Sequence, residues 1–172
     1  MSEEIEIVEY DPMWPALYEQ ERIMLAEALG PFAIDVQYVG STSVPGLAAK
    51  PIVDIAVAIE EYPLPDGRIA AIVALGYEHM GEFGIPQRHY FRKGPTGTLR
   101  THHVHVIELT NPEWENFILF RDYLRAHADV AQEYARLKKA LAGQYTQDRV
   151  AYTESKAPFI KDIMGRAKEW RD

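Results

Sequence analysis

The spacing of apolar residues changes within the first forty positions from a helical repeat to alternation. Leu17 and Leu25 belong to a run of apolar residues at roughly helical spacing, which begins after Asp11 and stops at Gly30. Asp is a favoured helix cap and Gly a common helix end, so this segment is predicted to be a helix. Residues 34–39 then alternate between apolar and polar side chains, which predicts a half-buried strand.

Further strands and one more helix follow, and the pattern then stays helical to the end of the chain. We expect helices over residues 11–29, 66–75, 128–142 and 147–170, a further helix opened by Pro112, strands over residues 34–39, 51–60, 77–80, 88–93 and 99–109, and a turn at 94–97. The large aromatic residues of the helices are expected to pack the core: Trp14, Trp114, Phe117, Phe120 and Phe159. This order predicts an α+β fold, in which helices cover one face of a mixed sheet and a C-terminal helical bundle follows.

Length and composition indicate one domain over residues 1–172, with an α/β core over about 1–110 and C-terminal helices over about 111–170. The apolar fraction of 47% is that of a protein with a packed core. The absence of Cys excludes disulfides and thiolate metal sites. The chain begins without the basic and apolar segments of a signal peptide, and no apolar run is long enough to cross a bilayer. A cytoplasmic location without a membrane role is therefore expected.

The charge balance narrows the class of partner. The formal net charge is −8 at pH 7. Long nucleic acids are bound through many phosphate contacts to a basic face, so this balance disfavours them as partners. A few basic side chains in a cleft can still bind one nucleotide or another phosphorylated small molecule.

The strand expected at 51–60 has two different faces. Side chains alternate along a strand, so Asp54 shares one face with small residues while branched residues occupy the other. Burial of an unpaired carboxylate is costly, so the face that carries Asp54 should border a cleft. The branched face is expected to lie beneath helices and comprises Val53, Ile55, Val57 and Ile59.

A later strand repeats this alternation. Val104 and Val106 suit a core face, whereas His103 and His105 share the other face. If this strand neighbours the first, both His side chains converge with Asp54. Imidazole and carboxylate groups together can bind a divalent metal such as Mg or Mn, and Zn is also compatible. The alternative is a network of hydrogen bonds in which the His residues bind no metal.

The residues between the first two expected strands suit anion binding. Gly40, Ser41, Thr42 and Ser43 directly follow the strand at 34–39. Backbone N–H groups and hydroxyls in such a run can bind phosphate, and Gly lets the backbone approach a ligand closely. Taken alone, the run also fits an ordinary turn.

A strand that ends in Gly-Ser, followed by a strand that carries Asp, resembles the signature of the nucleotidyltransferase superfamily. More narrowly, the chain resembles the GrpB family from about Val8 to Ala167, in the segments VGSTSVPGLAAKPIVDIAV, RTHHVHVIE, FRDYLRAH, YARLKKAL and YTESKAPFI. The resemblance implies a nucleotidyltransferase-like fold, a nucleotide at Gly40–Ser43 and a divalent metal at Asp54. Relatives of this domain also occur fused to dephospho-CoA kinase, which permits a link to coenzyme A metabolism.

The chain departs from the superfamily signature at the metal site. Asp54 matches the first carboxylate, but Ala56 stands where a second is expected, and His103 and His105 stand where a third is expected. Phosphoryl transfer of this class uses metal ions to neutralise charge and align the reacting groups. Either the two His residues replace the acids, which makes them and Asp54 catalytic as well as metal-binding, or the domain binds its ligand without the usual reaction.

Four basic residues are the expected partners of a phosphate group. Lys50 and Arg88 flank the sheet loops, and Lys138 and Lys156 lie in the helical segments that resemble the GrpB family. Basic side chains bind phosphate through charge-assisted hydrogen bonds. The alternative for the two helical Lys residues is simple exposure to solvent.

Three functions fit these observations. The leading one is a nucleotidyltransferase-type enzyme, or former enzyme, that binds a nucleotide or another phosphorylated small molecule and uses Asp54 with His103 or His105. The second is a non-catalytic metabolite-binding or accessory module, for example in coenzyme A metabolism. The third is a metal-dependent hydrolase that uses the same three residues. A Ser-His-Asp hydrolase is disfavoured because Ser41 and Ser43 lack the Gly-x-Ser-x-Gly spacing.

Overall fold

A computed structural model describes residues 4–94 and 100–172, so most of the turn expected at 94–97 lies outside the described residues. The α-helices are α1 (Trp14–Leu29), α2 (Asp66–Val73), α3 (Pro112–Ala126), α4 (Ala128–Gln144) and α5 (Arg149–Arg171), and the strands are β1 (Asp35–Val39), β2 (Val53–Ile59), β3 (Tyr77–His79), β4 (Arg88–Lys93) and β5 (His102–Glu108). Each expected helix and strand is present, and its ends lie within a few residues of the prediction.

The first residues of α1 and α3 differ in how they are capped. Asn111 caps α3, because its Oδ1 accepts a hydrogen bond from the backbone N–H of Glu113 at 3.0 Å. Asp11 accepts a similar bond from the N–H of Met13 at 2.9 Å, but α1 begins only at Trp14. The Asp11 side chain therefore shapes the turn before the helix and does not cap it.

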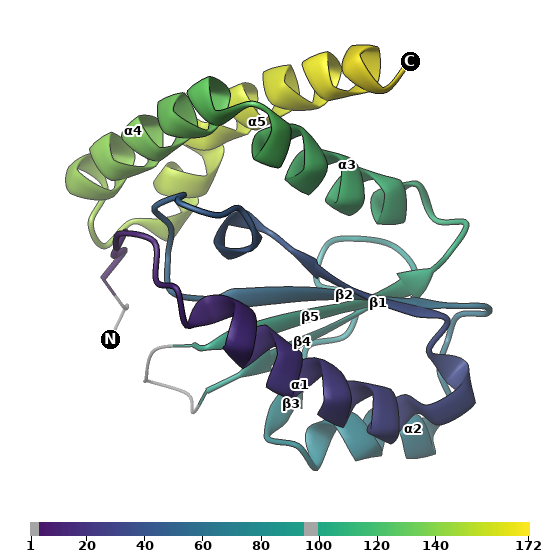
Figure 1. Cartoon of the computed structure of the whole chain (residues 1–172). Helices are drawn as coiled ribbons and strands as arrows, with labels where there is room; N and C mark the ends of the chain where they lie inside the picture. The colour runs from purple at the N-terminus through teal and green to yellow at the C-terminus, as the bar shows by residue number, and fades with distance from the viewer. Residues whose placement is uncertain (1–3, 95–99) are drawn as a thin grey trace.

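The strands form one mixed sheet in the order β1-β2-β5-β4-β3. β2 and β5 pair in parallel, and the other neighbouring strands are antiparallel. The parallel register places Asp54 beside His103, and His103 and His105 of β5 share the face of Asp54, whereas His102 lies on the other face. The two strands expected to carry the site are therefore direct neighbours at the centre of the sheet (Figure 1).

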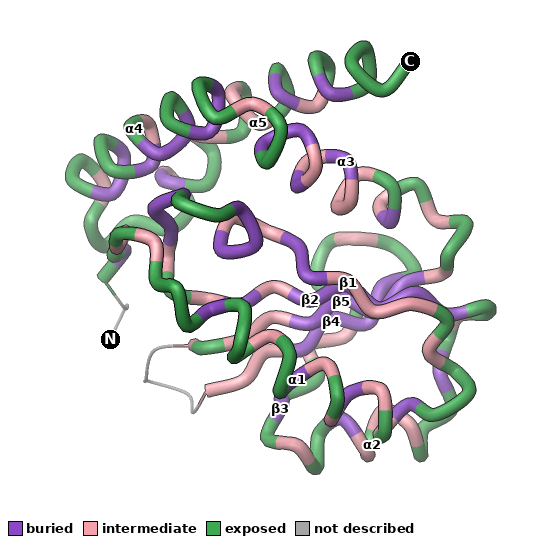
Figure 2. Tube along the Cα trace, in the orientation of Figure 1, coloured by how far each residue is buried: buried purple, intermediate pink, exposed green. Residues whose placement is uncertain are grey.

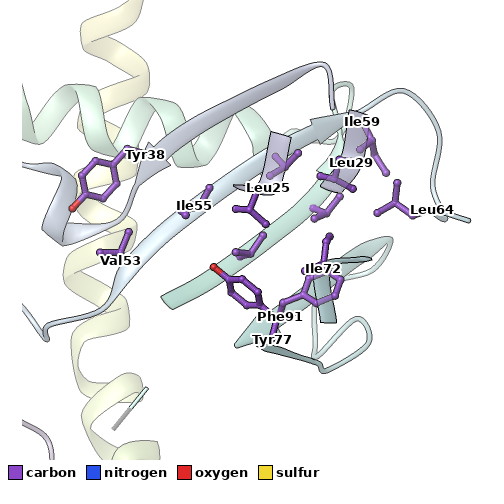
Figure 3. Packing of buried hydrophobic residues seen from close by; sticks show 13 residues of the cluster. Leu25, Leu29, Tyr38, Val53, Ile55, Ile59, Leu64, Ile72, Tyr77 and Phe91 are labelled. Carbon is purple, nitrogen blue, oxygen red and sulfur yellow. The ribbon is translucent and has the colours of Figure 1, made fainter. Parts of the chain in front are cut away.

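One face of the sheet is sealed by α1 and α2. Leu25 and Leu29 of α1 and Ile72 of α2 pack there with Phe91 and the branched residues of β2 (Figure 3). All four residues of the branched face, Val53, Ile55, Val57 and Ile59, belong to this cluster. At about 25 cal/mol per Å² of apolar surface, this burial is a main stabilising contribution to the fold. The predicted orientation of β2 is confirmed.

The opposite face of the sheet looks toward the C-terminal helices. α3, α4 and α5 form a layer on the other side of the sheet from α1 and α2 (Figure 1), and their outer surfaces are largely exposed (Figure 2). Trp114 of α3 packs on Ala56 and Ala58 of β2, while Leu124 of α3 and Ile163 of α5 join a separate cluster within the helical layer. α3 therefore covers only part of this face. None of the helices among the described residues combines the length and apolar character that a bilayer span requires.

Candidate functional site

The loop after β1 brings Gly40 against Asp54. Val39, the last residue of β1, pairs with Asp54 across the antiparallel ladder. Gly40 has a φ of 75° and a ψ of −179°, a conformation that is essentially limited to Gly. A Cβ atom at this position would lie 2.5 Å from Asp54 Oδ2, so a side chain here would displace the carboxylate. The predicted closeness of the loop and the carboxylate is confirmed.

Two of the loop hydroxyls predicted to bind phosphate hold the loop in shape instead. Thr42 Oγ1 accepts a hydrogen bond from Tyr38 Oη at 2.8 Å and donates one to a backbone carbonyl oxygen at 3.1 Å. Ser43 Oγ donates to the carbonyl oxygen of Gly40 at 2.5 Å. Thr42 and Ser43 are both buried, whereas Gly40 and Ser41 line a cavity. The phosphate-binding prediction therefore narrows to Gly40 and Ser41.

His103 and His105 approach the same oxygen of Asp54. Asp54 Oδ1 lies 3.5 Å from His103 Nδ1 and 3.3 Å from His105 Nε2. The parallel pairing of β2 and β5 produces this arrangement, because it aligns alternate side chains of both strands on one face. The predicted convergence of the three side chains is confirmed.

Arg88 determines which nitrogen of His105 carries the proton. Its Nε and Nη2 atoms donate to the carbonyl oxygens of Glu82 and Phe83 over 2.9 to 3.2 Å. Its Nη1 lies 3.1 Å from His105 Nδ1, which must accept because a guanidinium only donates. The neutral imidazole therefore carries its proton on Nε2 and donates it to Asp54. Arg88 was predicted to bind phosphate; the structure places it outside the cavity lining, where it contacts and orients His105.

The protonation states follow from burial and from these hydrogen bonds. Burial raises the pKa of Asp54, but hydrogen bonds from His103 and His105 outweigh it and hold that pKa well below its ordinary value. Burial lowers the pKa of His105 by more than the Asp54 carboxylate raises it. At neutral pH the centre of the site is thus an ionised carboxylate that accepts a hydrogen bond from a neutral imidazole.

The predicted metal centre requires free lone pairs on the His nitrogens. A neutral imidazole binds a metal through an unprotonated nitrogen. His105 has none to offer, because Nδ1 accepts from Arg88 and Nε2 carries the proton that points at Asp54. Over residues 4–94 and 100–172, no cluster of three or more His, Asp or Glu side chains has an arrangement that could hold a metal ion. These residues therefore do not fit a metal bound jointly by Asp54, His103 and His105.

Ala56 is fully buried beneath α3. It packs in the cluster of Trp114, with Phe117 and Ile118 of α3 against the same cluster. This position, where the superfamily signature expects a second carboxylate, is therefore closed by an apolar helix face. An Ala at this position, in place of the carboxylate, allows α3 to pack directly on β2.

A cavity of about 450 Å³ lies on the Asp54 face of the sheet, between the β1 loop and the C-terminal helices. Its size is typical of pockets for small ligands. Its polar lining includes Gly40, Ser41, Asp54, His105, Glu113, Asn116, Tyr134 and Lys156, and its apolar lining Val39, Phe117, Phe120, Ile160 and Met164. Lys156 is the basic residue of this lining; the charge of Asp54 raises its pKa in part, while the charge of Glu113 raises the pKa of Arg88, which lies outside the lining.

Three Lys residues gather around two Tyr rings beside this cavity. Lys50 Nζ lies 4.5 Å and Lys156 Nζ 4.8 Å from the centre of the Tyr152 ring, and Lys138 Nζ lies 4.4 Å from that of Tyr134. Lys138 is buried, and its Nζ has no hydrogen-bond partner among the described residues. In the part of the chain that the structure describes, no carboxylate forms an ion pair with any of the three. Three predicted phosphate-binding residues are thus brought together.

The Lys residues disfavour one another's charge. Burial lowers the pKa of Lys138 to about 7, and the charges of Lys156 and Lys50 add to this shift. Burial lowers the pKa of Lys50 to about 8, with further contributions from Lys156 and Arg149 that Asp54 only partly opposes. Burial also lowers the pKa of Lys156. An anion beside these groups would reverse the shifts by supplying the missing negative charge.

The sequence did not reveal the apolar wall of the cavity. Phe117 and Phe120 were expected in the core, but both are only partly buried and line the cavity together with Ile160 and Met164. Their spacing, three residues apart on α3 and four apart on α5, places each pair on one side of its helix. That spacing marks a shared face, and only the three-dimensional arrangement distinguishes a core from a cavity.

Comparison with known families and proteins places the chain among bacterial relatives. Residues 4–166 match the family model described as GrpB protein. The UPF0157 protein YqkA of Bacillus subtilis is 41% identical over 97% of this chain, and the chain spans 48% of that relative's length. A dephospho-CoA kinase of Mycolicibacterium paratuberculosis is 27% identical over 98% of the chain, which covers 47% of that protein.

Solved structures support the same relationship and extend it to a fold. The crystal structure of the conserved protein GrpB from Enterococcus faecalis has a TM-score of 0.90 and 40% identity, and covers 97% of this chain and all of that one. The Cid1 poly(U) polymerase has a TM-score of 0.54 at 16% identity, over 80% of this chain and 43% of that chain. The latter likeness shows that the fold is of the nucleotidyltransferase type.

Proposed function

The chain belongs to the GrpB family, and we propose that it binds a nucleotide or a similar phosphorylated small molecule in the cavity between Gly40-Ser41 and Lys156. The observation that carries the proposal is the group of three Lys side chains at this cavity. Lys156 lines the cavity and Lys50 and Lys138 lie beside it, within electrostatic range of Lys156, and among the described residues none of the three forms an ion pair with a carboxylate. A phosphate group supplies the negative charge that this arrangement lacks.

The apolar part of the cavity lining indicates what the phosphate is attached to. Phe117 and Phe120 of α3 face the cavity together with Ile160 and Met164 of α5. Aromatic and aliphatic side chains favour a ligand with a flat or apolar group, such as a nucleobase. A ligand with one apolar end and one phosphorylated end therefore matches the apolar and the basic parts of the lining.

A thermal-shift screen tests the proposal. The panel contains nucleoside mono-, di- and triphosphates, coenzyme A and dephospho-CoA, each with and without Mg²⁺ or Mn²⁺. A ligand at a hundredfold excess over its Kd stabilises the folded state by about 2.7 kcal/mol, which raises the Tm by about 5–10 °C in a chain of this size. Lys156→Met should remove most of this shift. No shift with any member of the panel would contradict the proposal.

The matched control is Lys161→Met. Lys161 is exposed on the same helix as Lys156 and lies outside the cavity lining. Its replacement removes the same formal charge from the chain, so it reports any general effect of net charge. We expect the Lys161→Met variant to keep the full ligand-induced shift. An equal loss in both variants would assign the effect to long-range charge and not to this cavity.

A second candidate function is nucleotidyl transfer to a hydroxyl acceptor with release of pyrophosphate. It is favoured by the place of Asp54, which lines the cavity beside Gly40. Against it, the pKa of Asp54 is lowered below its ordinary value, since its hydrogen bonds from His103 and His105 outweigh the effect of burial, and such a carboxylate is a weak base. Together with the buried Ala56 in place of a second carboxylate, the lowered pKa favours binding over transfer.

Asp54→Asn separates the two functions. If the chain only binds its ligand, this variant should bind a triphosphate more tightly, because one negative charge near the phosphates is lost. If the chain transfers a nucleotidyl group, wild-type protein should release pyrophosphate and the variant should lose that turnover while it still binds. Pyrophosphate release and calorimetric affinity, measured on both proteins, decide between the two.

A further inference from the structure

The cavity has few of the groups that hold a divalent cation against a polyphosphate. Mg²⁺ and Mn²⁺ are bound mainly by carboxylate oxygens. The signature's second carboxylate is replaced by Ala56, which is sealed beneath α3. His105 has no unprotonated nitrogen facing Asp54, because its Nε2 carries the proton. The other carboxylate of the lining, Glu113, interacts electrostatically with Arg88.

Three Lys side chains, in contrast, gather at and beside this cavity, whose lining includes Lys156 and the carboxylates of Asp54 and Glu113. Lys50 comes from the loop before β2, Lys138 from α4 and Lys156 from α5, and they gather around the rings of Tyr134 and Tyr152. The Nζ of Lys138 is buried and has no acceptor. A buried ammonium without an acceptor is destabilising, so its retention points to a partner that arrives with the ligand.

We propose that these three Lys residues take the part that divalent cations play elsewhere in this fold class, so that a polyphosphate group binds here as the free anion. The inference rests on the proposed function and names the chemical form of its ligand. A free triphosphate carries more negative charge than its magnesium complex, so clustered ammonium groups attract the free form more strongly. Divalent cations then compete with the protein for the phosphates and do not assist binding.

Isothermal titration calorimetry of the whole chain tests this with inorganic tripolyphosphate and with ATP. Each probe is titrated in a buffer that contains EDTA and, in parallel, in a buffer with saturating Mg²⁺. We expect the Kd in EDTA to be equal to or lower than the Kd with Mg²⁺. A Kd in EDTA that is higher than the Kd with Mg²⁺, outside the error of the measurement, would overturn the inference and leave the proposed binding intact.

The absence of binding in both the EDTA buffer and the Mg²⁺ buffer is a separate outcome. It would overturn the proposed function and, with it, the inference. The comparison uses wild-type protein, so it stays decisive even if a variant fails to fold.

Variants locate the effect. Lys156→Met should weaken the binding of tripolyphosphate in EDTA by about tenfold or more, because a charge-assisted hydrogen bond is lost. Lys161→Met, on the exposed side of the same helix, should change the Kd by less than about threefold. Equal affinities for the two variants would contradict a site at the Lys cluster.

Discussion

Lys138 places an amine inside the protein that, when protonated, forms no ion pair with any carboxylate of the described chain. Its Nζ is buried without a hydrogen-bond partner, over the ring of Tyr134. The aromatic face offers only a weak attraction compared with a carboxylate. Residues that reduce stability in this way are typical of functional sites, because selection for binding opposes selection for stability.

Lys138→Met should therefore have opposite effects on stability and on binding. Met fills a similar volume without a charge, so we expect the free energy of unfolding of the unliganded protein to rise by about 1–2 kcal/mol. The affinity for tripolyphosphate should fall. Urea denaturation and calorimetry on the same preparation measure the two effects. A fall in both quantities would show that Lys138 serves the fold.

Gly40 is the residue on which the position of Asp54 depends. Its positive φ is unfavourable for a side chain, and a Cβ atom would meet Asp54 Oδ2 at 2.5 Å. Gly40→Ala should lower the free energy of unfolding by about 1–3 kcal/mol and weaken ligand binding. The control is Gly165→Ala in α5, where a Cβ meets no atom within 4 Å, and a gain of about 0.5–1 kcal/mol is expected. Similar losses in both variants, measured in urea, would contradict this role of Gly40.

At the scale of elements, the site depends on how α3 sits on the β1 loop. Arg121 Nη1 donates to the carbonyl oxygen of Tyr38 at 3.0 Å and to Gln37 Oε1 at 2.8 Å. Arg125 Nε donates to the carbonyl oxygen of Ser43 at 2.9 Å. The same helix contributes the apolar wall of the cavity and closes the space over Ala56. α3 thus fixes the loop, shapes the cavity and removes the second carboxylate position.

The Lys cluster joins three elements and predicts how stability depends on pH. The pKa values of Lys138 and Lys50 are about 7 and about 8 in the folded chain, below the ordinary 10.5, because of burial and of the charges of Lys156 and Arg149. Between these values and 10.5 the unfolded chain binds more protons, so the free energy of unfolding rises with pH. Below pH 7 both Lys side chains are charged in the folded chain, and the full loss of stability from burying these charges is present. Asp54 offsets this loss only in part.

We therefore expect the unliganded protein to gain stability between about pH 6.5 and about pH 9, with a smaller gain in the Lys138→Met variant. A saturating polyphosphate should reduce the gain, since it favours the charged Lys residues. Urea unfolding at both pH values provides the measurement. An identical pH dependence in wild type and variant would rule out a contribution from Lys138.

At the scale of the whole molecule, the sequence predicted correctly which side chains share a face of a strand wherever apolar and polar residues alternate regularly. The alternation along β2 and β5 predicted that Asp54, His103 and His105 share one side of the sheet, and the structure confirms it. The roles of Thr42 and Arg88 were not predictable in this way. Their partners are backbone carbonyl groups and a His side chain, which a pattern of residue types does not specify.

The fold also explains why the cavity was missed while its cations were found. Lys50 was predicted because it flanks a sheet loop, and Lys138 and Lys156 because they lie in helical segments that resemble the GrpB family. The loop and the two helices that carry them meet at Tyr152 and Tyr134. Aromatic residues at helical spacing predict a buried stripe, whether the space beyond it is filled or empty. Only the packing of the helical layer against the sheet leaves room for a ligand.

The most direct measurement is a crystal structure of the chain soaked with ATP in buffer free of divalent cations. The account predicts that phosphate oxygens lie within about 3.2 Å of Lys156 Nζ and beside the backbone of Gly40-Ser41, with the base against Phe117 and Phe120. It also predicts no metal ion between the phosphates and Asp54. An empty cavity at saturating ATP, or phosphates bound elsewhere on the molecule, would contradict the account.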